Sequence, residues 1–122
     1  MEKHGTDFRC VFKYDQGTVL KYPKHNHLDL QFIADTQTYL SHYFPEVLPA
    51  KNMWDYLEMP IAPGTICSEN RFRRIRNRVI KVVAEVGKLG YHLKDANNKN
   101  IIYDSRCGEF YLVDFSKVIR LH

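Results

Sequence analysis

Apolar side chains recur at helical spacing over residues 69–89, and this is the strongest pattern in the 122-residue chain. Intervals of three and four place them on one stripe of a helix. Ser68 stands directly before the stripe as an N-cap, and Gly90 follows it where a glycine ends a helix. The apolar spacing from Leu28 to about Tyr43 predicts a second helix. The stripe of the first helix consists of Phe72, Ile75, Val79, Val82, Val83 and Val86.

Two stretches rich in β-branched and aromatic residues predict β-hairpins. The first, "FRCVFKYDQGTVLKY" (residues 8–22), turns at "DQG", where Gly17 supplies a positive φ. The second consists of "NIIYD" and "EFYLVDF", joined by "SRCG". The segment "FPEVLPAKNMWDYLEM" predicts one or two strands with a connector, and "PIAPGT" predicts a loop. This order of elements predicts an α+β fold, with a small sheet in front and a helix packed on a hairpin behind.

Composition narrows the class of protein. With 44% hydrophobic and 26% charged residues, the chain is typical of a globular domain, and its length suits one core. No apolar run reaches the ~20 residues needed to span a bilayer, and the N-terminus has no signal-peptide pattern. Three scattered cysteines indicate reduced thiols and a cytoplasmic protein, in the host cytoplasm if the chain is viral or an effector.

Candidate chemistry is concentrated in "LKDANNKNIIYDSRCGEFYLVDFS", residues 93–116. Asp95, Asn100 and Asp114 lie within two dozen residues, beside two strand-like runs. Asn and Asp side chains often bond to local backbone, so turn capping is one explanation of the cluster. Carboxylate and amide oxygens are also the ligands of hard divalent cations such as Mg²⁺. The residues alone favour turn capping.

The same segment resembles the catalytic loop and metal-binding motif of the protein-kinase superfamily. Asp95 is followed after five positions by Asn100, as in that loop. Beyond the hairpin, Asp114-Phe115-Ser116 takes the place of Asp-Phe-Gly. The likeness covers about residues 5–118 and shifts the balance towards a metal–nucleotide site. It implies that Asp95 is the catalytic base and that Asn100 and Asp114 bind Mg²⁺.

The front of the chain carries the rest of the resemblance. "TVLK" is similar to the family's Val-Ala-Ile-Lys strand and makes Lys21 the residue that contacts the ATP phosphates. Asp35, nine residues before Phe44, corresponds to the glutamate that pairs with this lysine. The remaining implied nucleotide contacts are Val11, at the end of a Gly-rich loop, and the hinge residues Glu58 and Met59.

The resemblance implies a single minimal kinase-like domain over residues 1–122. Residues 1–59 correspond to an N-lobe, with a small antiparallel sheet and helix C in front. Residues 60–122 correspond to a truncated C-lobe, with helix E and the catalytic-loop hairpin behind. The chain ends six residues after Ser116, without an activation segment or substrate-binding helices. We therefore expect a truncated protein-kinase-like fold.

Several positions depart from the kinase pattern, and they leave two functions open. The first is an ATP- and Mg²⁺-dependent phosphotransferase, a serine/threonine kinase or autokinase that acts with a partner. The alternative is a pseudokinase or decoy that binds a kinase or another signalling protein. The departures are Leu93 for histidine, Asn97 for the catalytic-loop lysine, Ser116 for glycine, Asp35 for glutamate, and Gly5 as the remnant of the glycine loop.

The basic stretch "RFRRIRNRVIK", residues 71–81, permits a third function. Five arginines and a lysine in eleven residues are compatible with nucleic-acid binding, although a solvated helix face is favoured. An acidic partner protein is another explanation. Since so short a chain covers the apolar stripe only partly, we also expect a partner or a homodimer at the 69–89 helix. The pair His25 and His27 has too few ligands for a zinc site.

Overall fold

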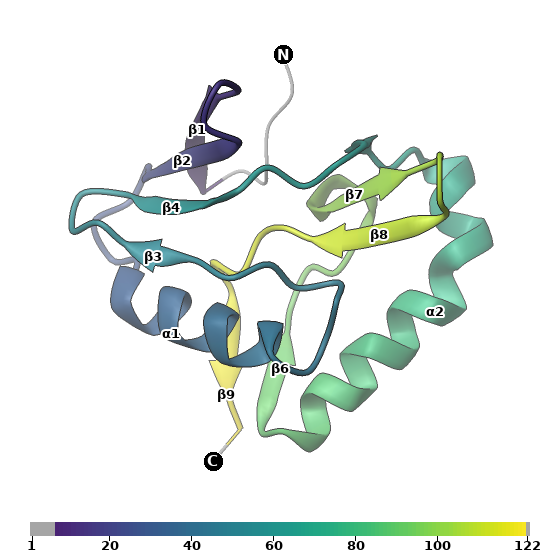
Figure 1. The fold of residues 1–122 in the computed structure, drawn as a ribbon. Helices are drawn as coiled ribbons and strands as arrows, with labels where there is room; N and C mark the ends of the chain where they lie inside the picture. The colour runs from purple at the N-terminus through teal and green to yellow at the C-terminus, as the bar shows by residue number, and fades with distance from the viewer. Residues whose placement is uncertain (1–6, 122) are drawn as a thin grey trace.

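The helices and hairpins lie where the apolar pattern places them, in a computed structural model that describes residues 7–121 (Figure 1). The helices are α1 (Leu30–Ser41) and α2 (Glu69–Lys88), with a short 3-10 turn, η1 (Asn98–Asn100). The strands are β1 (Phe8–Lys13), β2 (Thr18–Pro23), β3 (Lys51–Asn52), β4 (Leu57–Pro60), β5 (Thr65–Ile66), β6 (Tyr91–Leu93), β7 (Ile101–Asp104), β8 (Glu109–Leu112) and β9 (Val118–Arg120).

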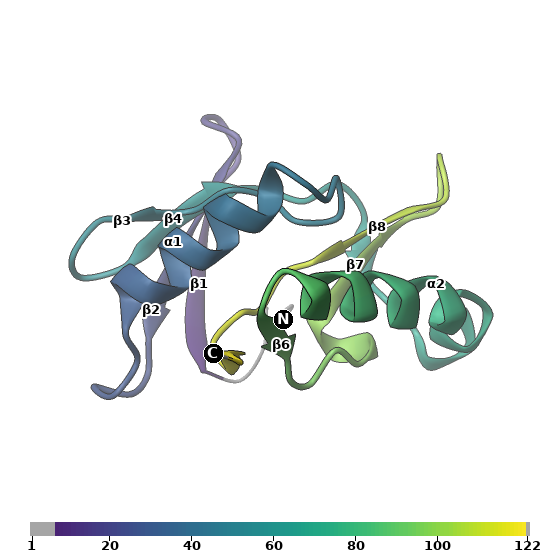
Figure 2. The ribbon, with the colours of Figure 1, turned by 90° about the horizontal axis from the view of Figure 1, so that it is seen from below.

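The front layer is an antiparallel sheet in the order β1-β2-β4-β3 with α1 beneath it (Figures 1 and 2). The β1–β2 hairpin is confirmed, and Gly17 has the expected positive φ of 68°. Asp29 begins α1 because its carboxylate accepts a hydrogen bond from the backbone N–H of Phe32 at 3.0 Å. The apolar face of α1, which includes Ile33 and Leu40, is buried against the sheet.

The back layer consists of α2, the sheet β5-β7-β8 and the pair β6-β9. Ser68 caps α2 as expected, since its hydroxyl accepts from the backbone N–H of Arg71 at 3.1 Å, and Gly90 follows the end of the helix. Two arginines fix α2 on the hairpin by stacking on aromatic rings. The Arg71 guanidinium lies 4.7 Å from the Tyr103 ring centre, and that of Arg78 lies 5.1 Å from Phe110.

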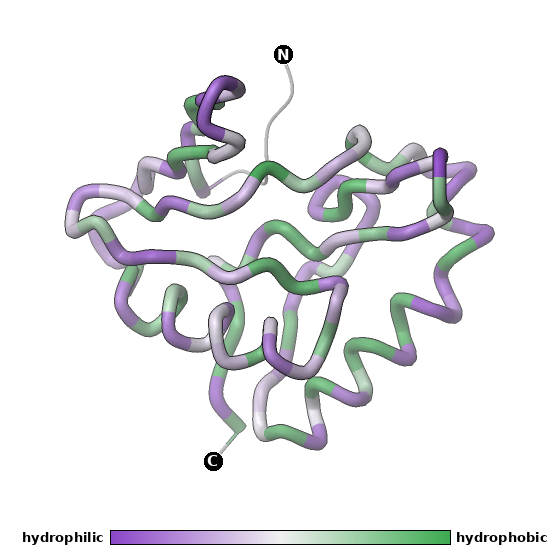
Figure 3. The backbone as a smooth tube through the Cα atoms, in the orientation of Figure 1, coloured by the Kyte–Doolittle hydropathy of each residue, from purple (hydrophilic) through white to green (hydrophobic). Residues whose placement is uncertain are grey.

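One apolar core joins the two layers. It includes Phe8 and Leu57 from the front sheet, Val79 from α2, and Ile101 and Phe110 from the rear hairpin. Hydrophobic and hydrophilic positions alternate along α2, as the helical spacing requires (Figure 3). The stripe is only partly covered, as expected: three of its members are buried and three are half-buried. The buried members are Ile75, Val79 and Val86, and the half-buried ones are Phe72, Val82 and Val83.

Gly64 allows the chain to pass close to the rear hairpin. Its φ is 113°, and a Cβ atom at this position would lie 2.2 Å from the backbone oxygen of Tyr103. Only glycine tolerates both this conformation and this approach. Within residues 7–121, no helix is long and apolar enough to cross a membrane.

Candidate functional site

Lys21 crosses from the front sheet to the rear hairpin. Its side chain is 1% exposed, and its ammonium donates a hydrogen bond to the backbone oxygen of Val113. The Phe8 ring covers it, with the ring centre 5.6 Å from Nζ. Val113 stands directly before Asp114 in the chain, so the lysine lies next to the predicted metal ligand.

Burial is the main influence on the ionisation of Lys21. Loss of hydration lowers the pKa of Lys21 below its ordinary value, and the nearby charge of Asp114, followed by Cys10, opposes this effect in part. Among residues 7–121 the ammonium has one carbonyl acceptor, which engages one of its three N–H donors. An anionic group that entered this region would therefore find a strong partner.

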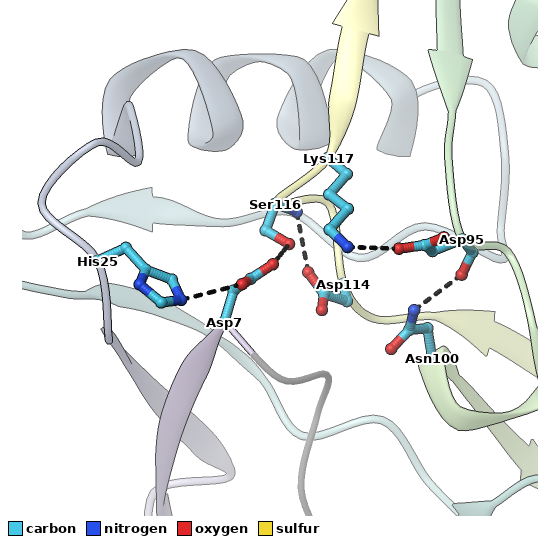
Figure 4. Close-up of polar contacts among 7 residues, drawn as sticks. All are labelled: Asp7, His25, Asp95, Asn100, Asp114, Ser116 and Lys117. Carbon is cyan, nitrogen blue, oxygen red and sulfur yellow. Dashed lines mark hydrogen bonds and ion pairs between the residues drawn. The ribbon is translucent and has the colours of Figure 1, made fainter.

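The polar loop before the rear hairpin brings Asp95 and Asn100 together (Figure 4). Asp95 has a positive φ of 60°, and its backbone oxygen accepts a hydrogen bond from the Asn100 amide at 2.7 Å. The backbone N–H of Val113 donates to the Asn100 backbone oxygen at 3.1 Å, which joins this loop to the segment before Asp114. The Asn97 side chain caps the turn by accepting from Lys99 N–H at 3.0 Å.

Asp114 is half-buried at the end of the rear hairpin. Its Oδ1 accepts a hydrogen bond from the backbone N–H of Ser116 at 2.9 Å. The Ser116 hydroxyl in turn donates to Asp7 Oδ2 at 2.7 Å, and Asp7 pairs with His25 at 3.4 Å (Figure 4). This chain of contacts ties the beginning of β1 to the segment after Asp114.

Lys117 is a second cation beside these aspartates. Its ammonium lies 2.8 Å from Asp95 Oδ2. The hydrogen bond to Asp95 raises the pKa of Lys117, and the charges of Asp95, Asp7 and Asp114 raise it further. The fold explains the contact, because Leu93 of β6 pairs antiparallel with Val118 of β9. The loop that follows Leu93 and contains Asp95 therefore lies beside Lys117, which precedes Val118.

The oxygen donors of Asn100 and Asp114 fit Mg²⁺. The Asn100 amide nitrogen bonds to Asp95, which leaves the amide oxygen for an ion, and Asp114 engages Oδ1 with Ser116. In the part of the chain that the structure describes, no three His, Cys, Asp or Glu side chains are grouped to hold a metal ion alone. Mg²⁺ commonly uses only one or two carboxylates and takes its other ligands from phosphates and water. The site therefore suits an ion that arrives with a nucleotide.

Asp35 lies apart from Lys21. It is exposed on α1, and its Oδ1 accepts a hydrogen bond from Gln31 at 2.8 Å. α1 buries two polar residues, Thr36 and Gln37. Gln37 is 1% exposed and donates to the Leu48 backbone oxygen at 2.9 Å. Within residues 7–121 no ion pair joins Asp35 to Lys21.

The three predicted nucleotide contacts lie in the front sheet. Val11 of β1 is half-buried opposite Leu20 of β2. Glu58 of β4 pairs with β2 on one side and with Lys51 of β3 on the other. Met59 is buried, and its sulfur accepts a hydrogen bond from Gln37 at 3.5 Å. The contact of these residues with a nucleotide stays a prediction.

Three residues of this region were not expected from the sequence: Asp7, Gln37 and Lys117. Lys117 meets Asp95 through the pairing of β6 with β9, and Asp7 meets Ser116 where the front layer packs on the rear one. The local pattern has no signal for either contact. Gln37 had a usable signal. It falls four positions after Ile33 and three before Leu40, on the apolar face of the predicted helix.

Comparison with known proteins shows the fold. No protein-family model matches the chain, and no curated protein matches it. Structures of WbdD, one described as the bifunctional kinase-methyltransferase, do match. A medium-resolution structure aligns with 93% of this chain at 16% identity and a TM-score of 0.58. A high-resolution structure aligns with 98% at 15% identity and a TM-score of 0.62.

A third WbdD structure contains a kinase inhibitor and aligns with 95% of this chain at 15% identity and a TM-score of 0.57. The chain spans about a third of the length of these proteins, 30% of the first and 32% of the other two. At such identities the likeness establishes the arrangement of elements. The chain is a small α+β protein with antiparallel sheets and a truncated kinase-like fold.

Proposed function

We propose that this chain is an ATP- and Mg²⁺-dependent phosphotransferase, with a serine or threonine of a protein as acceptor. The observation that carries the proposal is the position of Lys21, whose buried ammonium reaches the residue before Asp114. This contact supports a site in which the lysine of the front sheet and the oxygen donors of the rear loops act together. Kinase-like structures as neighbours support the same activity.

Each candidate residue has a role that its position supports. Phosphoryl transfer mainly requires neutralised phosphate charge and an aligned nucleophile. Lys21 would bind the nucleotide phosphates, and Asp95, exposed on its loop, would accept the proton of the attacking hydroxyl. Asn100 and Asp114 would hold Mg²⁺, which when bound neutralises charge on the phosphates. Asp35 would not pair with Lys21, since its carboxylate bonds to Gln31.

Nucleotide binding would require the two layers to separate locally. Lys21 is covered by Phe8, and the nearby Asp7–Ser116 contact joins the beginning of β1 to the rear segment. A phosphate that reaches Lys21 replaces the Val113 carbonyl as its partner. Because a phosphate is charged and the carbonyl is neutral, the exchange strengthens the hydrogen bond to the ammonium.

Transfer from radiolabelled ATP tests the proposal. We expect label on the chain itself or on an added protein, dependent on Mg²⁺ and reduced at least about a hundredfold in Asp95→Asn. Asp55→Asn, an exposed aspartate in the β3–β4 loop, is the matched control and keeps the transfer. Absence of label on every protein tested, with folded wild-type chain, would rule out the activity.

The alternative function, a pseudokinase or decoy, is favoured by one observation. Lys21 and Asp95 already have partners within the chain, Val113 and Lys117. A binding module would not need Lys21 and Asp95 to be released from these partners. It predicts that Asp95→Asn keeps partner binding and biological effect, whereas loss of the effect would favour the enzyme.

The groove on α2 is the proposed contact with a protein partner. It is lined by apolar side chains and Arg76, and Ile80 in its lining is 56% exposed. The helix carries seven basic and two acidic side chains, so an acidic amphipathic segment complements it. Two copies would bring like charges together, which disfavours a homodimer through this face. The apolar lining consists of Phe72, Val79, Ile80, Val83, Ala84 and Ala96.

A pair of synthetic helical peptides tests this surface. One carries a leucine stripe flanked by glutamates, and the other has lysines in place of the glutamates. We expect the acidic peptide alone to bind, with affinity that falls as salt rises and is lost in Ile80→Asp. Ile119→Asp, at another partly exposed isoleucine, is the control. Equal binding of both peptides, or a dimer in sedimentation, would contradict the proposal.

Nucleic-acid binding through the same basic face makes a different prediction. Arg71 and Arg78 stack on rings of the hairpin, which leaves Arg73, Arg74 and Arg76 for a polyanion. Oligonucleotide binding would weaken steeply with salt and disappear when these three are neutralised together. Failure to retain RNA or DNA at low salt excludes this function.

A further inference from the structure

Lys117 places an ammonium among the carboxylates of the candidate site. It pairs with Asp95 at 2.8 Å, and it lies within electrostatic range of Asp7 and Asp114 (Figure 4). Asp7 is also engaged by Ser116 and faces His25. Lys117 thus pairs with Asp95 of the polar loop, and the charges of Asp7, directly before β1, and of Asp114, after β8, act on it as well.

The backbone holds Lys117 in this position. β6 and β9 are paired antiparallel, with Leu93 opposite Val118, so the loop after β6 and the turn before β9 run side by side. The backbone N–H of Val118 donates to Phe115 at 3.2 Å and closes that turn. The lysine side chain itself is 52% exposed. The backbone of Lys117 is therefore fixed, while its ammonium can move by rotation about the side-chain bonds.

We propose that Lys117 is a tethered counter-cation of the candidate metal site, which excludes free Mg²⁺ and favours a metal–nucleotide complex. The inference rests on the proposed function, because it takes Asn100 and Asp114 as the ligands of the ion. Lys117 neutralises the carboxylates in the nucleotide-free protein. A divalent cation that enters alone must displace or approach this ammonium.

The positive charge of Lys117 produces the selectivity between free Mg²⁺ and the metal–nucleotide complex. Free Mg²⁺ carries two positive charges and is repelled by Lys117, whereas Mg²⁺ bound to a triphosphate is part of a net anion and is attracted by it. Like charges a few ångströms apart repel and unlike charges attract, most strongly where water is partly excluded. The same lysine therefore opposes one form of the ion and assists the other.

A titration with MgCl₂ in the absence of nucleotide tests the inference without any need for activity. Binding is followed by thermal stability and calorimetry in wild type, Lys117→Met, Lys117→Gln and Lys117→Arg. Lys51→Met removes an exposed lysine on β3 and controls for the change in net charge. We expect both neutral variants to bind Mg²⁺ at least about tenfold more tightly than wild type. Lys117→Arg and Lys51→Met bind like wild type.

Two results would overturn the inference. One is that both neutral variants bind Mg²⁺ within about threefold of the wild-type affinity, or that none of the proteins binds Mg²⁺. The other is a gain in Lys117→Arg as large as in Lys117→Met. Failure of the proposed function is seen separately, as a wild type that does not respond to ATP with Mg²⁺. Tighter Mg²⁺ binding by the neutral variants would support the role of Lys117 in either case.

Discussion

Lys21 of β2 donates a hydrogen bond to the backbone oxygen of Val113, the residue that precedes Asp114. The two residues are 92 positions apart in the chain and come from different layers of the fold. The bond therefore exists only because the front sheet and the rear hairpin pack against each other. It is the geometric basis for the proposed nucleotide site between Lys21 and Asp114.

Lys21→Met is expected to separate function from stability. Burial of the ammonium is unfavourable, but its removal leaves the Val113 carbonyl without its partner, and the two effects are of similar size. We expect the free energy of unfolding to change by less than about 1.5 kcal/mol in urea titrations. ATP binding disappears. Wild-type affinity for ATP in this variant would contradict the role of Lys21.

The lowered pKa of Lys21 predicts a pH dependence of stability. Burial, the main cause, makes the folded protein release this proton at a lower pH than the unfolded chain, whose lysine has a pKa near 10.5. Between the two values the unfolded state binds more protons, so this contribution to stability rises with pH. The unfolding free energy of wild type minus that of Lys21→Met should increase as pH rises towards 10.5. A flat difference would mean that Lys21 is solvated.

Asp95→Asn is expected to impair transfer while it preserves nucleotide binding. A general base contributes about 10²- to 10⁴-fold to the rate, so turnover should fall by that factor. The substitution also removes the negative charge opposite Lys117 but leaves the backbone oxygen that accepts from Asn100. Rapid-quench assays with radiolabelled ATP measure the rate, and calorimetry measures the affinity. Equal rates in the two proteins would exclude Asp95 as the base.

Gly64→Ala and Gly17→Ala provide a matched test of the fold. Both glycines have positive φ, but a Cβ atom at Gly64 meets the backbone of Tyr103, whereas nothing lies within 4 Å of one at Gly17. We expect Gly17→Ala to lower the free energy of unfolding by about 1 kcal/mol, from conformation alone. Gly64→Ala should lower it by about 3 kcal/mol or more. Similar losses in both would contradict the close approach to the rear hairpin.

The spacing of apolar residues predicted those features of the fold that depend on residues close together in the chain. The stripe of α2 and both hairpins follow from residues that are neighbours in the chain. The expectation that Lys21 lies near Asp114 came from the resemblance to kinases, and the structure places the lysine at Val113, the residue before Asp114. The contact of Lys117 with Asp95 depends on the register between β6 and β9, which no local pattern encodes.

The helix α1 shows where counting along the chain is insufficient. Asp35 was selected by its distance from Phe44 and is exposed, whereas Gln37, two residues further on, is buried. Positions two apart on a helix point about 200° from each other, so a shift of two changes the face completely. The apolar neighbours Ile33 and Leu40 would have selected Gln37 instead.

Thermal denaturation with ATP, in the presence and absence of Mg²⁺, tests the central claim most directly when wild type is compared with Asp114→Asn. A ligand that binds the native state at a hundredfold excess over its Kd stabilises it by about 2.7 kcal/mol. The account predicts a rise in the wild-type Tm of several degrees that requires Mg²⁺ and is absent in the variant. An unchanged wild-type Tm, or an equal rise in Asp114→Asn, would contradict it.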